Sequence, residues 1–137
     1  MAPRSDRASS HLGARIRDTR ILLIGATGNN GGEILRALDE LGARPRLLVR
    51  SLERARERWP GERDWVVGDL TRPDTLAEAL RGIDVVINAA ATRELDGPNG
   101  VEAVDLGGMR NLIAAAKPAG VQRIVLITGM VVGRPES

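Results

Sequence analysis

A glycine-rich stretch near the start of the chain has the residue types and spacing of a phosphate-binding loop. It reads GATGNNGG. Gly25 allows the chain to turn sharply, Gly28 allows the backbone to approach a pyrophosphate closely, and Gly31 allows a following helix to pack tightly on a sheet. The N–H groups near Asn29 and Asn30 then face the anion, and the helix dipole contributes roughly 0.3–2 kcal/mol to holding it. The stretch predicts a site for the pyrophosphate of a dinucleotide.

The elements on either side of this stretch decide between a binding site and a loop that is glycine-rich for packing alone. Residues 21–24 form a continuous apolar run, as expected of a strand buried on both faces. Residues 30–41 carry apolar side chains at helical spacing, Gly42 is a stop signal, and residues 47–49 read as a second strand. A strand, loop, helix and second strand in this order favour the binding site.

The residues that follow the second strand distinguish between NAD and NADP. Proteins that bind NAD often place Asp or Glu there, which accepts hydrogen bonds from the ribose 2′-hydroxyl. This chain has Arg50 and Ser51 instead, with Arg54 about one helical turn further on. A guanidinium suits the 2′-phosphate of NADP, and a charge-assisted bond of this kind contributes roughly 1.5–3 kcal/mol. The alternative is that these arginines are solvated surface charges; we expect NADP(H) rather than NAD(H).

Two further loops lie where parallel sheets bind ligands, beyond the carboxyl ends of the strands. Asp69 and Leu70 follow the expected third strand, and Ala89 and Ala90 follow the fourth. The carboxylate of Asp69 has two alternative roles: it accepts from the amino group of adenine, or it caps the turn that leads into Thr71. The small alanines leave room for the ribose and the nicotinamide.

The whole chain alternates short aliphatic runs with helical stretches. Strands this close in sequence to helices imply right-handed crossovers and a parallel sheet covered on both faces. We predict an α/β fold, a Rossmann-type doubly wound parallel sheet with five strands in the order 3-2-1-4-5 and four helices. The expected strands are residues 21–24, 47–49, 65–67, 85–87 and 124–127, and the expected helices are residues 30–41, 52–58, 71–80 (capped by Thr71 and Asp74) and 101–116.

The composition excludes several classes of function. The 137 residues suffice for one domain, and two Trp with no Phe and no Tyr require an aliphatic core. The absence of Cys and the single histidine, His11, exclude thiolate and paired-histidine metal sites. The net charge of +2 is balanced rather than clustered, so we expect no nucleic-acid partner. We expect no membrane contact either, because no apolar run approaches the ~20 residues of a membrane span.

The first 19 residues differ in composition from the rest, being rich in Arg, Ser and Ala. We interpret residues 1–19 as a disordered N-terminal extension, followed by a domain over residues 20–137. A transit peptide for import into an organelle is the alternative interpretation of this composition. We otherwise expect a cytoplasmic protein.

From Arg20 to about Gly133 the sequence resembles the short-chain dehydrogenase/reductase superfamily, especially its atypical, NmrA-like members. The resemblance rests on ILLIGATGNNGG, LVR, GDL, VVINAA, DLGGMRNLI and AGVQRIVLIT, which start at residues 21, 48, 68, 85, 105 and 119. It implies an NAD(P)-binding domain with cofactor contacts at Gly25, Thr27, Gly28, Asn29, Asn30, Arg50, Asp69, Leu70, Ala89 and Ala90.

The chain departs from the pattern that the resemblance implies for catalysis. Reductases of this superfamily usually carry a Ser or Thr after the fifth strand and then a Tyr-x-x-x-Lys pair, whose Tyr donates the proton. Thr128 takes the first hydroxyl position, Gly129 stands where the catalytic hydroxyl is expected, and the chain has no Tyr. The usual mechanism therefore cannot operate in this polypeptide. Superfamily members continue into a sixth strand and a small C-terminal region, so we expect a truncated cofactor-binding domain that lacks the usual C-terminal part.

Three functions follow as alternatives. The first is an oxidoreductase that uses NADP(H) on a small-molecule substrate, with Thr128 as a weak catalytic candidate and Asn88 as a second group able to orient a carbonyl. The second is a non-catalytic dinucleotide-binding or redox-sensing module, and the third is an inactive N-terminal fragment of a reductase. An exposed edge of the fifth strand also favours a homo-oligomer.

Overall fold

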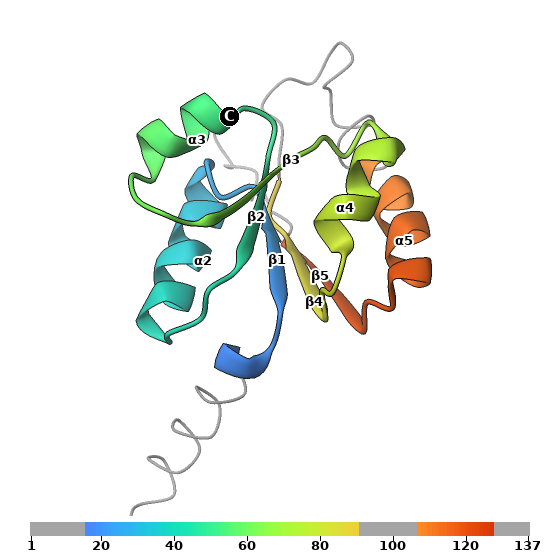
Figure 1. Cartoon of the computed structure of the whole chain (residues 1–137), viewed down its shortest axis with the longest axis horizontal. Coiled ribbons are helices and arrows are strands. Elements are labelled where there is room, and N and C mark those ends of the chain that lie inside the picture. Colours follow the sequence, from blue (N-terminus) through green and yellow to red (C-terminus); the bar gives the residue numbers. More distant parts are fainter. Residues whose placement is uncertain (1–15, 91–106, 128–137) are drawn as a thin grey trace, which may run out of the picture.

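The computed structural model describes residues 16–90 and 107–127. Among these residues, from the first strand to the last, four α-helices and one short 3₁₀ turn alternate with five strands (Figure 1). Along the chain they are β1 (Ile21–Ile24), α2 (Asn29–Glu40), β2 (Arg46–Val49), α3 (Leu52–Arg58), β3 (Asp64–Val67), η1 (Pro73–Thr75), α4 (Leu76–Leu80), β4 (Val85–Asn88), α5 (Gly108–Ala119) and β5 (Arg123–Leu126).

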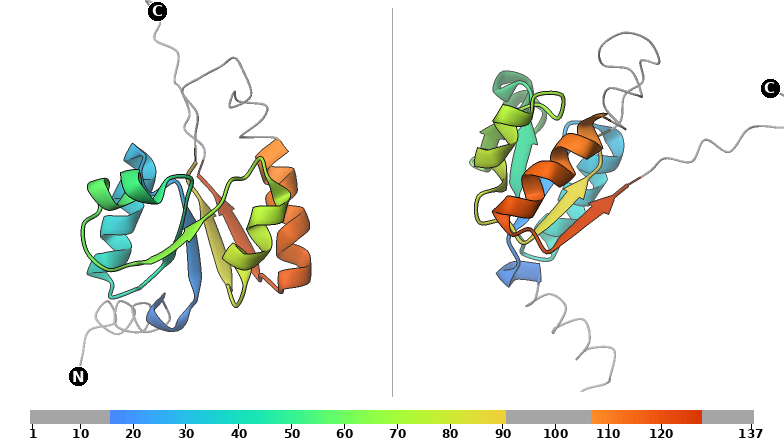
Figure 2. Two further views of the ribbon diagram at one scale, coloured as in Figure 1. Left: turned by 45° about the horizontal axis from the view of Figure 1, so that its top comes forward. Right: turned by 90° about the vertical axis from the view of Figure 1, so that its right-hand side faces the viewer.

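The strands form one parallel sheet in the order β3-β2-β1-β4-β5. Leu23 in the central strand aligns with Leu47 of β2 and with Ile87 of β4. Helices α2 and α3 cover one face of the sheet and α4 and α5 cover the other, while β5 forms one edge (Figures 1 and 2). The predicted Rossmann-type fold and strand order are confirmed.

Each face of the sheet carries its own apolar core. All four residues of β1 are buried, because this strand is covered on both sides. Leu22 and Ile24 pack toward α4 and α5, whereas Ile21 and Leu23 pack toward α2. The core is aliphatic as predicted, with one exception: Trp59 is buried in the cluster beneath α2.

Two helices differ from their predicted bounds by more than one residue. The expected helix over residues 71–80 begins only at Leu76, after the turn η1, and neither Thr71 nor Asp74 provides a side-chain cap. The reason is that the N–H and hydroxyl of Thr71 both donate to Asp69. The last helix continues through Pro118 to Ala119 and is capped by Gly120, whose φ of +79° is readily adopted by glycine. Residues 101–106 of that predicted helix lie outside the described residues.

The residues that the structure describes begin at Ile16, before the predicted domain boundary at residue 20. Residues 16–18 form a helical turn, and the side chain of Ile16 packs against the core beneath α2. Residues 1–15 of the predicted extension lie outside the described residues. Among the helices that the structure describes, none is long and apolar enough to cross a membrane.

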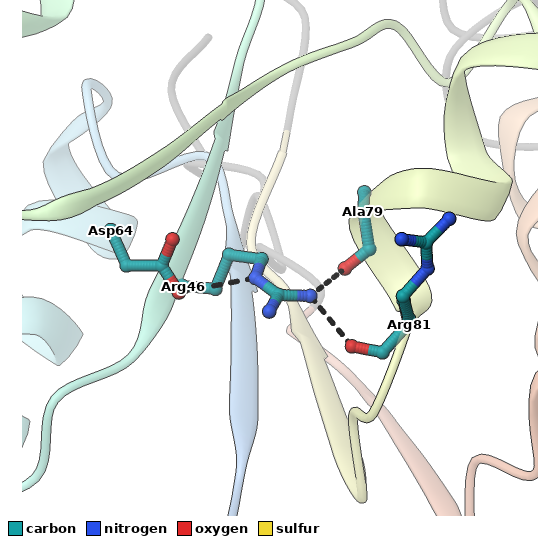
Figure 3. A network of polar contacts seen from close by, with 4 residues as sticks. All are labelled: Arg46, Asp64, Ala79 and Arg81. Carbon is teal, nitrogen blue, oxygen red and sulfur yellow. Dashed lines mark hydrogen bonds and ion pairs between the residues drawn. The ribbon is translucent and has the colours of Figure 1, made fainter.

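An arginine at the amino end of the sheet joins three elements (Figure 3). The Nε of Arg46 donates to Asp64 Oδ2 at 3.1 Å, and its Nη1 donates to the carbonyl oxygens of Ala79 and Arg81 at 3.0 and 2.8 Å. The last carbonyls of a helix have no partner within the helix. Arg46 therefore caps α4 and ties it to β2 and β3, at the end of the sheet opposite the predicted binding loops.

Candidate dinucleotide-binding site

The predicted loops meet at the carboxyl edge of the sheet, where parallel strands all end on the same side. Gly25 follows β1 with φ +95°, a conformation that side chains disfavour. A Cβ on Gly25 would lie 2.6 Å from the carbonyl carbon of Ala89 and 2.7 Å from the nitrogen of Ala90. The glycine-rich loop thus packs directly on the chain that leaves β4, and this contact requires a glycine.

The next two glycines have different roles. A Cβ on Gly31 would overlap the carbonyl group of Gly25, so glycine here lets α2 begin close beneath the loop. A Cβ on Gly28 would meet only the oxygen of Gly25, at an ordinary 3.4 Å. The protein itself would therefore accept a side chain at Gly28. Its absence opens the outer side of the loop, as the close approach of a pyrophosphate requires.

The start of α2 presents unpaired backbone donors. Its first internal hydrogen bond runs from the N–H of Gly32 to the oxygen of Gly28 at 2.9 Å. Within the described part of the chain, the N–H groups of Asn29, Asn30 and Gly31 have no acceptor. These donors and the helix dipole favour an anion here. Thr27 and both asparagines are exposed beside them.

The structure places the residues after β2 beside the same edge. Arg50 is exposed, and its charge acts on the neighbouring Asp69. Ser51 accepts a hydrogen bond from the N–H of Arg54 at 3.3 Å and so caps α3. A hydroxyl that accepts one bond can still donate another. Ser51 therefore has a structural role that is compatible with the predicted contact.

Asp69 forms the turn that follows β3. Its Oδ1 accepts from the N–H of Thr71 at 2.9 Å and from the Thr71 hydroxyl at 2.8 Å. Burial raises the pKa of Asp69, but these bonds and the nearby Arg50 and Arg72 guanidinium groups outweigh it and lower the pKa below its ordinary value. The second oxygen, Oδ2, accepts no hydrogen bond from the described residues. Asp69 can thus serve the turn through one oxygen and a ligand through the other.

Two side chains that hold this turn were missed in the sequence. The hydroxyl of Thr75 accepts the N–H of Asp69 at 2.9 Å, and Asn111 from α5 donates to the oxygen of Leu70 at 2.8 Å. Asn111 is 41 residues from Leu70, and although Thr75 is only six residues from Asp69, the local sequence does not mark it as the partner of this turn. The side chain of Leu70 is buried in the core, so it offers a ligand only its main chain.

The residues after β4 contact the glycine-rich loop through their backbone, and their N–H groups are already hydrogen-bonded. The N–H of Ala89 donates to Ile24 at 2.8 Å, and the N–H of Ala90 donates to Asn88 Oδ1 at 3.1 Å. Asn88 is 2% exposed, and its Nδ2 contacts the sulfur of Met109 at 3.1 Å. Asn88 is therefore buried in this arrangement and is not exposed to orient a substrate carbonyl. Thr128, the catalytic candidate, lies outside the described residues.

The comparisons with known proteins agree with this geometry. A model of the NAD(P)H-binding family matches residues 25–137. The photosystem II assembly factor Ycf39 of Cyanophora paradoxa is 43% identical over 111 residues, which cover 79% of this chain and 33% of that protein. The NAD(P)H azoreductase of Xenophilus azovorans is 36% identical over 110 residues, which cover 80% of this chain and 35% of that protein. The chain spans about a third of the length of these relatives.

A solved structure extends the comparison to the fold. A short-chain dehydrogenase/reductase superfamily protein from Agrobacterium tumefaciens, with bound NAD, superimposes with a TM-score of 0.65 at 28% identity. The superposition covers 78% of this chain and 31% of that chain. The resemblance to this superfamily, stated from the motifs, is confirmed.

Proposed function

The chain belongs to the NAD(P)H-binding family, and we propose that it binds NADP(H) in preference to NAD(H). One observation carries this proposal: Arg50 stands at the carboxyl end of β2, exposed and without an ion-pair partner among the described residues. A carboxylate at this position would accept from a ribose 2′-hydroxyl, whereas a guanidinium attracts the 2′-phosphate.

The remaining residues fit the other parts of the cofactor. The free N–H groups of Asn29 and Asn30 would hold the pyrophosphate, and Asp69 Oδ2 would accept from the adenine amino group. Ala89 and Ala90 lie against Gly25 and leave space for the nicotinamide half. When bound, the nicotinamide supplies or accepts a hydride.

The test of the preference is a pair of charge reversals on opposite ends of β2. Arg50→Asp should weaken NADPH relative to NADH by about 10- to 100-fold, as expected for one charge-assisted bond. Arg44→Asp makes the same change at an exposed site next to the amino end of β2, and it should leave the ratio within about twofold. Calorimetric titration of each variant with both dinucleotides gives the ratio. Equal ratios for wild type and Arg50→Asp would refute the assignment.

For the function of the whole protein we propose an oxidoreductase that acts on a small-molecule substrate. The similarity to a protein named NAD(P)H azoreductase supports this proposal. The Tyr-x-x-x-Lys pair is absent from these 137 residues, so the catalytic group is not assigned. The second candidate is a dinucleotide-binding module without catalysis, and the similarity to a protein named as an assembly factor favours it.

One experiment separates these candidates. Oxidation of NADPH is followed by absorbance against a panel of carbonyl, quinone and azo compounds. Turnover that the dinucleotide-binding variant Arg50→Asp reduces would support the oxidoreductase. Tight binding of NADPH with no turnover would support the binding module. No binding at all would support the third alternative, an inactive fragment of a reductase.

Two further expectations remain proposals. We propose that the edge of β5, where Leu126 is 46% exposed, pairs with a second copy of the chain. Sedimentation over a range of concentrations tests the homo-oligomer, and a monomer at all concentrations would refute it. A cytoplasmic location is tested by fractionation of cells that carry the tagged protein.

A further inference from the structure

A tryptophan outside all the predicted motifs is hydrogen-bonded to the glycine-rich loop. Trp59 directly follows α3, and its side chain is buried in the core beneath α2. Its indole Nε1 donates to the carbonyl oxygen of Ala26 at 2.9 Å in a buried hydrogen bond. Ala26 is the second residue of the loop and is itself 0% exposed. The bond therefore links the chain between α3 and β3 to the inner side of the loop.

The second glycine of the pair at the start of α2 makes this approach possible. A Cβ on Gly32 would lie 3.5 Å from Cζ2 of Trp59 and 3.3 Å from Nη2 of Arg58. The indole edge thus lies against the backbone of the first turn of α2. A longer side chain at this position would separate the ring from the loop that it contacts.

Three guanidinium groups hold the indole ring in place. The guanidinium carbons of Arg58, Arg63 and Arg36 lie 4.7, 5.2 and 5.6 Å from the ring centroid. Arg63 also forms a bidentate salt bridge with Asp39 of α2, with N–O distances of 3.1 and 2.9 Å. Because cation–π contacts of this kind restrict the ring, the indole N–H has little freedom to leave Ala26.

We propose that Trp59 is a positioning residue of the dinucleotide site. It touches no part of the ligand; it fixes the carbonyl of Ala26, and through it the conformation of the loop that aims the N–H groups of Asn29 and Asn30. The proposal rests on dinucleotide binding and not on the preference for NADP(H). Both dinucleotides share the pyrophosphate, so Trp59 should matter equally to both.

The second tryptophan supplies a matched control. Trp65 packs against the same core cluster, but its indole nitrogen is buried and has no hydrogen-bond partner among the described residues. Trp59→Phe and Trp65→Phe therefore remove the same atoms from one core, and only the first removes a hydrogen bond to the loop. We expect Trp59→Phe to weaken NADPH and NADH alike by about tenfold. Trp65→Phe should change neither by more than about twofold.

Calorimetric titration measures these affinities at a temperature where circular dichroism shows each variant folded. Equal losses in the two variants, or no loss in Trp59→Phe, would overturn the positioning role. A loss in Trp59→Phe without any NADPH preference in wild type would refute the NADP(H) proposal alone. A wild type that binds neither dinucleotide would refute both.

A measurement on the wild-type chain keeps the proposal testable if Trp59→Phe does not fold. Labelling with ¹⁵N-tryptophan gives two indole N–H signals, one for each of the two Trp. Added NADPH should shift the Trp59 signal and slow its exchange with solvent, and leave the Trp65 signal in place. A Trp59 signal that does not respond while NADPH binds would overturn the proposal.

Discussion

Replacing two adjacent glycines by alanine tests the geometry of the site most directly. At Gly31 an added Cβ would overlap the backbone carbonyl of Gly25 and come within 3.0 Å of the nitrogen of Ala26. Neither atom can move without moving the loop. At Gly32 the closest atom is the end of the Arg58 side chain, at 3.3 Å, and a surface guanidinium can move aside. The same methyl group therefore has different effects at neighbouring positions.

The expected magnitudes follow from these contacts. Overpacking against backbone costs about 1–3 kcal/mol of unfolding free energy or more. A displaced loop also misaligns the free N–H groups, and the loss of one charge-assisted bond lowers affinity by about 10- to 100-fold. Alanine in a helix is about 0.5–1 kcal/mol more favourable than glycine. Gly31→Ala should thus lower both the melting temperature and the affinity for NADPH, whereas Gly32→Ala should leave stability unchanged or raise it slightly.

Thermal unfolding with and without NADPH, together with calorimetric titration, measures both quantities. The useful comparison is the difference between the two variants, because both make the same chemical change. Equal affinities in Gly31→Ala and Gly32→Ala would refute the close approach of loop and helix on which the site depends. A loss of NADPH affinity in Gly32→Ala alone would show that the contact between α2 and the Trp59 indole, rather than the contact between α2 and Gly25, limits the space at this position.

Three further predictions concern groups around the site and at the opposite end of the sheet. Arg46→Met leaves the carbonyls at the end of α4 without this donor and should lower the free energy of unfolding in urea by about 1–3 kcal/mol. The affinity for NADPH should stay the same, and a change in it would contradict the separation of the two ends of the sheet. Thr75→Val removes the acceptor for the N–H of Asp69 and should lower the free energy of unfolding by about 1–3 kcal/mol. It should also weaken the binding of NADPH, and unaltered binding would show that this turn is not part of the site. Because the pKa of Asp69 is lowered in the folded chain, its carboxylate stabilises the fold above the ordinary pKa of 3.8, and this contribution is lost as pH falls through the folded value. Asp69→Asn should therefore lose less stability on acidification than wild type, and identical acid-unfolding profiles would refute this.

Most of the fold could be predicted because its signals are local. The continuous apolar run from Ile21 to Ile24 favours a strand covered on both faces, and the structure buries all four side chains. The predicted α3, residues 52–58, agrees with Leu52–Arg58 in the structure. The bounds of α4 were wrong, because Thr71 bonds to Asp69 instead of capping a helix. A capping residue and a turn residue have the same side chain, and only the fold shows which partner it meets.

The sequence by itself determined the strands and the glycine-rich loop and showed that Arg50 and Asp69 follow two of these strands, since backbone sterics and apolar periodicity act between neighbours in the chain. The strand order was predicted from the general topology of doubly wound parallel sheets. Only the tertiary structure decided which side chains are committed elsewhere. It buried Asn88 against Met109, 21 residues away, and joined Trp59 to Ala26 across 33 residues. Contacts of this kind depend on how helices pack on the sheet, and no local pattern encodes them. The loop that could hold a dinucleotide was visible in the sequence, while the residue that holds the loop became visible only in the fold.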